Sequence, residues 1–168
     1  MDHYLARDAC WRVRAGGRGT LTVADNSLRL DEFLCFAIHS TAHAINRATK
    51  PLLDELGLTY PQYLVMVVLW GRDDQTVGSI GEKLFLESST LTPLLKRLEA
   101  AGYVQRARDP SDERQVRVRL TDKGRELHCR ANCIPEWFRE AFDGNVEEAQ
   151  ELKARIVALR ERVLKQPD

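Results

Sequence analysis

A cysteine and two histidines at helical spacing are the residues of this 168-residue chain best suited to chemistry. Cys35, His39 and His43 follow one another at intervals of four, and Asn46 comes three residues later. Since a helix brings residues three and four apart onto one face, they predict a polar stripe on an otherwise apolar segment. A deprotonated thiol is a nucleophile, and thiol and imidazole groups are also zinc ligands.

Four interpretations of this stripe stay open. In the first, a partial positive charge on His39 favours the reactive thiolate form of Cys35. In the second, Cys35, His39 and His43 bind a metal such as zinc. In the third, the stripe lines a pocket for another ligand, and in the fourth it faces solvent or a second subunit. A cysteine between apolar neighbours, as at residues 33–36, is otherwise typical of an inert core position.

A second group of polar residues opens a short amphipathic stretch, residues 87–102, which Gly102 is expected to end. Its apolar positions repeat at helical spacing and predict a buried stripe formed by Leu91, Leu94, Leu95 and Leu98. The polar positions lie mostly off this stripe and are Ser88, Ser89, Thr90, Thr92, Lys96 and Arg97. We expect one hydroxyl group to cap the helix and the other polar groups to contact DNA.

The neighbouring segments predict a winged helix-turn-helix. Residues 59–62 form a capping box that starts a very apolar helix, and Thr76 caps a short helix joined to the polar one by a tight turn. After Gly102 the period changes to two, which predicts strands at residues 103–108 and 115–120. A basic hairpin in this place is a wing that reaches the minor groove. Its expected DNA-contacting residues are Arg106, Arg108, Asp112, Arg114 and Arg117.

Long apolar stripes at both ends of the chain predict further helices, near residues 30–48 and 146–164. Pro51 is expected to open a separate short helix, and Pro135 to break the helix that Thr121 caps. The two stripes have no obvious partner inside a small winged helix, so they indicate dimerisation; packing of the two within one chain is the alternative. The expected division is a flexible tail at residues 1–28, a dimerisation region at 29–58 and 122–168, and a DNA-binding domain at 59–121.

Composition is that of an ordinary globular protein, with 43% hydrophobic and 30% charged residues and a formal net charge of zero. Charge is unevenly placed, because residues 96–130 hold ten Lys and Arg against six Asp and Glu. The chain has no apolar run long enough for a membrane span and no secretory signal. Its four cysteines do not form paired zinc knuckles, which favours the cytoplasm and no metal or other cofactor.

These segments resemble the MarR family of bacterial repressors, and within it the organic-hydroperoxide sensors of the OhrR branch. The resemblance spans roughly residues 30–164 and is carried by residues 34–36 (LCF), 50–63 (KPLLDELGLTYPQY), 91–98 (LTPLLKRL) and 112–114 (DER). It implies a mainly α fold with a small β-hairpin, in which N- and C-terminal helices flank a winged helix-turn-helix and form a homodimer on double-stranded operator DNA. Arg114 would enter a minor groove while Asp112 holds it; the pair alone also fits a turn-stabilising ion pair.

The resemblance further implies that Cys35 is the redox-sensing thiol, with His39, His43 and Tyr60 as its environment. Its attack on an organic hydroperoxide is expected to give a sulfenic acid that condenses with a second thiol or is over-oxidised, after which the dimer leaves DNA. The family usually has tyrosines where this chain has His39 and Thr49.

Two cysteines four residues apart, Cys129 and Cys133, are the candidates for a resolving thiol, because two-cysteine members of the branch carry one in the C-terminal helical region. We therefore expect a repressor rather than an enzyme, released by oxidation of Cys35. A repressor released by a phenolic or other anionic small molecule is the main alternative, ahead of a thiol peroxidase and an architectural DNA binder.

Overall fold

The protein is mainly helical with one small antiparallel sheet, as the sequence predicts. The computed structural model describes residues 29–131 and 133–166, so the predicted tail at residues 1–28 lies outside the described residues. The chain divides after Ala37 into two units. In chain order the elements are η1 (Leu30–Glu32), α1 (Leu34–Leu56), α2 (Tyr60–Gly71), β1 (Gln75–Thr76), α3 (Val77–Leu84), α4 (Ser88–Ala100), β2 (Val104–Arg108), β3 (Val116–Leu120), α5 (Asp122–Arg130), α6 (Cys133–Glu140) and α7 (Val146–Leu164).

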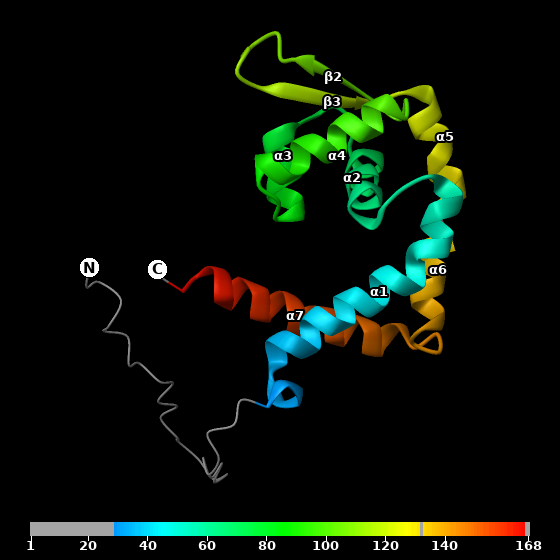
Figure 1. Cartoon of the computed structure of the whole chain (residues 1–168), viewed down its shortest axis with the longest axis vertical. Helices are drawn as coiled ribbons and strands as arrows, with labels where there is room; N and C mark the ends of the chain where they lie inside the picture. The colour runs from blue at the N-terminus through cyan, green and yellow to red at the C-terminus, as the bar shows by residue number, and fades with distance from the viewer. Residues whose placement is uncertain (1–28, 132, 167–168) are drawn as a thin grey trace, which may run out of the picture. The chain divides into compact units, whose positions relative to one another are not determined.

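A winged helix-turn-helix belongs to the second unit, with α2, α3 and α4 grouped under the β2–β3 hairpin (Figure 1). Burial of aliphatic side chains holds these elements together, and each fully buried leucine contributes about 2 kcal/mol. The core residues with almost no exposed surface are Val65, Met66, Leu69, Ile80, Leu91, Leu95, Leu98, Val104 and Val118. Three of the four predicted stripe leucines of α4 are therefore confirmed as core, and Leu94 is half-buried.

Hydroxyl and amide side chains start three of the helices where the sequence predicts. The Thr59 amide donates to Gln62 Oε1 at 2.8 Å, as a capping box requires. Thr76 Oγ1 accepts from the Ser79 amide at 3.1 Å, and Thr121 Oγ1 accepts from the Gly124 amide at 3.0 Å. These caps fix the starts of α2, α3 and α5 and hence the spacing of the helix-turn-helix.

The prediction that Pro51 opens a separate short helix is wrong. Pro51 lies inside an uninterrupted α1, because burial of Leu53 and Leu56, two and five residues later, offsets the hydrogen bond that proline cannot make.

The helix that Thr121 caps does end before Pro135, at Arg130. Pro135 itself lies in the first turn of a further helix that was not predicted, α6, where its missing amide removes no helical hydrogen bond. Ile134 from the same turn is buried, so the core extends beyond residue 121 into α5 and α6.

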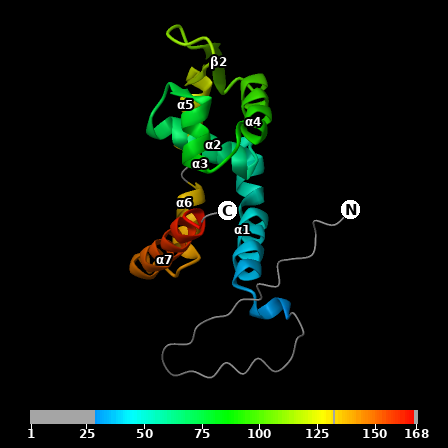
Figure 2. The ribbon, with the colours of Figure 1, turned by 90° about the vertical axis from the view of Figure 1, so that its left-hand side faces the viewer.

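The sheet has the strand order β1-β3-β2, and its first strand was not predicted. The hairpin register pairs Val104 with Leu120 and Arg108 with Val116. The short strand β1 pairs Gln75 with Val118 on the other edge of β3. Two residues are too few to show the alternating pattern of a strand, so this strand is recognised only from its pairing with β3. Figures 1 and 2 show the tip of the hairpin projecting from the helices.

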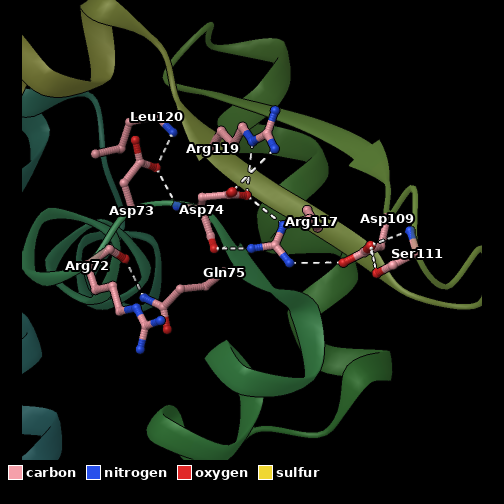
Figure 3. A network of polar contacts seen from close by, with 9 residues as sticks. All are labelled: Arg72, Asp73, Asp74, Gln75, Asp109, Ser111, Arg117, Arg119 and Leu120. Atoms are coloured by element: carbon pink, nitrogen blue, oxygen red, sulfur yellow. Dashed lines mark hydrogen bonds and ion pairs between the residues drawn. The ribbon is translucent and has the colours of Figure 1, made fainter.

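A network of charged side chains ties the hairpin to the loop after α2 (Figure 3). The Asp74 carboxylate accepts from Arg117 Nε at 2.7 Å and from Arg119 Nη2 at 3.2 Å. The Asp74 carbonyl accepts from Arg117 Nη2 at 2.7 Å. Arg117 Nη1 reaches Asp109 Oδ2 at 2.9 Å, and Asp109 also accepts from the Ser111 amide at 2.8 Å. Arg117 therefore bridges the α2–β1 loop and the base of the hairpin tip.

The last helix, α7, buries none of its side chains within the described structure. Several of its large apolar side chains are exposed, and they are Val146, Leu152, Ile156, Val163 and Leu164. None of the helices within residues 29–131 and 133–166 combines the length and the apolar character that crossing a bilayer requires.

Replacing Gly124 with alanine should destabilise the fold, because a Cβ there lies 2.1 Å from the Tyr103 carbonyl oxygen. That oxygen accepts the Thr121 amide, so it is not free to move away. We expect Gly124→Ala to lower the free energy of unfolding by about 2–4 kcal/mol in urea denaturation. Gly71→Ala is the matched control, since no atom lies within 4 Å of its added Cβ. Equal stability of the two variants would contradict this packing.

Acid should weaken the fold through the carboxylates of the network. Hydrogen bonds from Arg117 and then Arg119 lower the Asp74 pKa to about 2, and those from Ser111 and then Arg117 hold the Asp109 pKa well below its ordinary value of 3.8. Because both folded pKa values lie below the unfolded ones, their contribution is complete above about pH 4 and is lost as the pH falls toward 2.

The urea midpoint of the wild type should therefore fall between about pH 4 and pH 2, and should fall less in Asp109→Asn. Asp122→Asn, at a carboxylate whose side chain is 99% exposed, is the control that should keep the wild-type pH profile. An Asp109→Asn profile parallel to that of the wild type would show that Asp109 adds no pH dependence.

Candidate nucleic-acid interface and redox site

Helix α4 is anchored by one face and exposes the other. Leu91, Leu95 and Leu98 are buried, while every predicted polar position on α4 is exposed except Thr92, which is half-buried. The turn before α4 is tight, because Phe85 adopts a left-handed φ of 56° and a Cβ on Gly81 would lie 2.7 Å from the Leu86 carbonyl oxygen. This turn orients the first turn of α4.

No side chain within the described structure caps the first turn of α4, so the predicted hydroxyl cap is not found. Glu87 occupies the cap position without a side-chain hydrogen bond to the helix. Thr92 Oγ1 instead donates to the Ser88 carbonyl at 2.7 Å. The first amides of α4, with the positive end of its dipole, therefore remain available to a phosphate, beside the hydroxyl groups of Ser89 and Thr90.

Two of the predicted wing arginines are exposed at the hairpin tip. Arg108 Nη1 donates to the Glu113 carbonyl at 3.1 Å, and the Arg114 guanidinium has no carboxylate partner among the described residues. Asp112 accepts from the Arg114 amide at 3.1 Å, so it shapes the turn through the main chain of Arg114. Its second oxygen accepts from Gln115 Nε2 at 3.0 Å. The tip thus presents the Arg114 guanidinium, which has no carboxylate partner among the described residues, on a hydrogen-bonded turn.

The other two predicted wing arginines, Arg106 and Arg117, are half-buried and paired. Arg106 Nη2 lies 2.6 Å from Glu99 Oε2, and its amide donates to Glu99 Oε1 at 3.0 Å. This pair lowers the Glu99 pKa and ties β2 to α4. Arg117 is engaged by Asp74 and Asp109. Sequence cannot show the pairing of Arg117 with Asp74, because the two residues are far apart along the chain. We now expect Arg106 and Arg117 to hold the wing in place and not to contact DNA.

Cys35 is a free and exposed thiol in the first turn of α1, in the unit that ends at Ala37. His39 and His43 belong to the second unit, where both are exposed and their rings meet edge to face with centroids 4.4 Å apart. Tyr60 begins α2 and is half-buried, and burial raises its hydroxyl pKa. No group of three or more His, Cys, Asp or Glu suited to a metal ion occurs in the part of the chain that the structure describes. The environment of Cys35 stays a prediction.

The two candidate resolving thiols lie on either side of the joint between α5 and α6. Cys129 is exposed, and Cys133 is half-buried against the core. Cys133 Sγ donates to the Arg130 carbonyl over 3.6 Å. Only Cys129 is therefore fully accessible without movement of the joint.

A groove of about 770 Å³ was missed from the sequence. It is lined mainly by apolar side chains of α1, α6 and α7, together with Tyr60. Among its lining residues are Ile45, Tyr60, Phe138, Phe142, Leu152 and Ile156. The interpretation of Pro135 as a helix breaker concealed α6, whose apolar face supplies Phe138. The apolar stripe of α7 was the available signal.

Comparisons with known proteins agree with this architecture. The family model described as transcriptional regulator SarA/Rot matches residues 47–130. The chain is 47% identical over 142 residues to the HTH-type transcriptional regulator TtmR of Methylorubrum extorquens, covering 84% of this chain and 73% of TtmR. It is 39% identical to the organic hydroperoxide resistance transcriptional regulator of Bacillus subtilis, covering 80% of this chain and 91% of that protein.

Among solved structures, AbfR of Staphylococcus epidermidis matches with a TM-score of 0.68 and 35% identity over 79% of this chain and 92% of AbfR. AbfR structures include the reduced protein bound to DNA, the overoxidised protein bound to DNA and a disulfide form. The winged helix-turn-helix and these similarities together show that the chain belongs to the MarR family of transcriptional regulators, in the group that includes the SarA/Rot-type regulators and the Bacillus subtilis hydroperoxide regulator.

Proposed function

We propose that this regulator binds operator DNA through α4 and the β2–β3 wing and represses transcription. The observation that carries the proposal is the polar first turn of α4, anchored by buried leucines and left without a side-chain cap. Exposed Lys96 and Arg97 supply phosphate contacts, and Arg114 at the wing tip suits the narrow minor groove. The AbfR structures on DNA support this use of the fold. We place the chain among regulators and not enzymes.

The regulator acts as a homodimer in this proposal, with residues 29–58 and 122–168 forming the interface. The exposed apolar side chains of α7 support it, because exposed apolar patches of this kind mark interaction sites. Packing of α7 within one chain is the weaker alternative, because α7 buries no side chain in the described structure. A dimer also places two recognition helices on a two-fold axis, which suits a near-palindromic operator.

Oxidation of Cys35 is the proposed release signal. The Cys35 thiolate attacks the terminal oxygen of an organic hydroperoxide, so an S–O bond forms, the O–O bond breaks and an alcohol leaves. The exposure of Cys35 and of the neighbouring His39–His43 pair supports access by such a reagent. The sulfenic acid then condenses with a second thiol, forming an S–S bond and releasing water.

We place release at the disulfide stage and not at over-oxidation. Overoxidised AbfR is bound to DNA in its crystal structure, and AbfR also forms a disulfide. The exposed Cys129 is the preferred resolving thiol, because Cys133 is held against the core. A disulfide from Cys35 of one subunit to Cys129 of the other would change the helical region that spaces the two recognition helices.

A ligand-released repressor is the second candidate function, and the apolar groove favours it. About 770 Å³ is enough for a small aromatic molecule, and Tyr60 and Arg139 would supply polar contacts to a phenol or another anion. In this candidate, release from DNA depends on a ligand in the groove and not on Cys35. Replacement of Cys35 would then leave release unchanged, whereas under thiol sensing it would abolish release.

Arg114→Ala should weaken binding to a duplex selected by the wild-type protein from a randomised pool. We expect a loss of about tenfold in affinity by fluorescence anisotropy, with a salt slope smaller by about one. The control is Arg72→Ala in the loop after α2, which removes the same charge from an exposed side chain outside the proposed dimer interface. Selection of no duplex, or equal losses in the two variants, would count against the proposed interface.

Cumene hydroperoxide should release the wild type from this duplex and should leave Cys35→Ser bound. Intact-mass measurement should show one added oxygen on Cys129→Ser and a disulfide-linked dimer for the wild type. Cys133→Ser is the matched control and should still form the disulfide. Undiminished release of Cys35→Ser would refute thiol sensing and leave the groove as the input.

A further inference from the structure

Asp74 lies outside the wing but holds it. It belongs to the loop between α2 and β1, and its backbone has a left-handed φ of 56°. In this conformation both its carboxylate and its carbonyl face Arg117, and each accepts a hydrogen bond of 2.7 Å from it. The carboxylate also lies 2.9 Å from Arg119 Nε. Arg117 is only 28% exposed, so these contacts are shielded more than a surface ion pair (Figure 3).

From Arg117 the network continues to the wing tip. Arg117 Nη1 donates to Asp109, whose side chain is 9% exposed. Asp109 in turn accepts from the Ser111 amide and hydroxyl, at 2.8 and 2.6 Å. Its own amide donates to the Gln115 carbonyl at 2.9 Å, which closes the turn that carries Arg114. Each link is a charge-assisted or main-chain hydrogen bond, so the tip turn is fixed to Asp109.

Asp74 itself is fixed by its neighbours to the helix-turn-helix. The Asp73 carboxylate accepts from the amides of Asp74 and Leu120, at 2.7 and 2.8 Å. Gln75 is buried and donates to the Val68 carbonyl at the end of α2 at 3.1 Å. Its Oε1 accepts from Lys83 of α3. The network therefore connects α2 and α3 of the helix-turn-helix to the tip of the wing.

We propose that Asp74 is a positioning residue for DNA binding: through Arg117 and Asp109 it sets where the wing tip lies relative to the helix-turn-helix. This inference rests on the proposed DNA-binding function. Asp74 makes no DNA contact in it, since its carboxylate is already occupied by two arginines. The wing tip must match the minor groove while α4 lies in the major groove, so an error in their spacing loses one of the two contacts.

The sign of the charge change separates positioning from simple electrostatics. Asp74→Asn makes the protein more positive near DNA, which by itself strengthens binding to phosphates. Positioning predicts the opposite, a weaker complex. Asparagine also tolerates a left-handed backbone better than other residues with a side chain, so this variant keeps the local conformation and removes mainly the charge.

The test compares Asp74→Asn with the wild type and with Glu82→Gln, which makes the same charge change at an exposed side chain of α3 outside the proposed dimer interface. On the selected duplex we expect Asp74→Asn to lose about threefold to tenfold in affinity. Its hydroxyl-radical footprint, which reports access to the sugars in the minor groove, should lose the protection under the wing. Dimethyl sulfate protection of guanine N7 in the major groove under α4 should stay. Glu82→Gln should bind like the wild type or slightly tighter.

Hydrogen exchange of the free protein provides a readout that needs no DNA. Amides of the tip, including Ser111 and Gln115, should exchange faster in Asp74→Asn, while amides of the α4 core keep wild-type rates. Arg117→Lys, which keeps the charge but cannot bridge two carboxylates, should give the same effect, and the double variant should add little.

Equal or tighter DNA binding by Asp74→Asn overturns the inference, as does unchanged exchange at the tip. A uniformly weakened footprint with faster exchange in the core overturns it too, because that pattern reports general destabilisation. If the wild type selects no duplex, the proposed function fails; the exchange data still decide whether Asp74 holds the tip.

Discussion

Burial of one face of α4 is the constraint on which the rest of the structure depends. Leu91, Leu95 and Leu98 lie in the core contributed by α2, α3 and the sheet, and this burial leaves the opposite face to polar side chains. A 13-residue helix is marginally stable in isolation. Its polar end can therefore stay uncapped and open to an anion only because the leucines on its other face hold it.

The elements that sequence predicts well are those with local signals. Thr59, Thr76 and Thr121 mark helix starts because a cap needs only a side chain and a nearby amide. The leucine period of α4 and the alternation of the hairpin are equally local. The order of these elements was enough to indicate the MarR family, and the comparisons confirmed it.

The features that sequence could not predict depend on contacts between distant residues. Whether Pro51 breaks a helix depends on how deeply the following leucines are buried. Strand β1 exists only through its pairing with β3. The arginines of the hairpin look alike in sequence, but Glu99 and Asp74 engage Arg106 and Arg117 and leave Arg114 free. The role of each arginine therefore depends on its carboxylate partner, which a repeating sequence pattern does not identify.

The continuity of α1 through Pro51 has a mechanical consequence. A helix rises about 1.5 Å per residue, so the part of α1 from Ile38 to Leu56 is about 28 Å long. Its buried residues all lie near its C-terminal end, so this end is held by the core. Because Pro51 removes a hydrogen bond in this held part, the helix bends most easily there. The Ile38 end lies about 20 Å from Pro51, so a bend of about 10° at Pro51 displaces that end by about 3 Å.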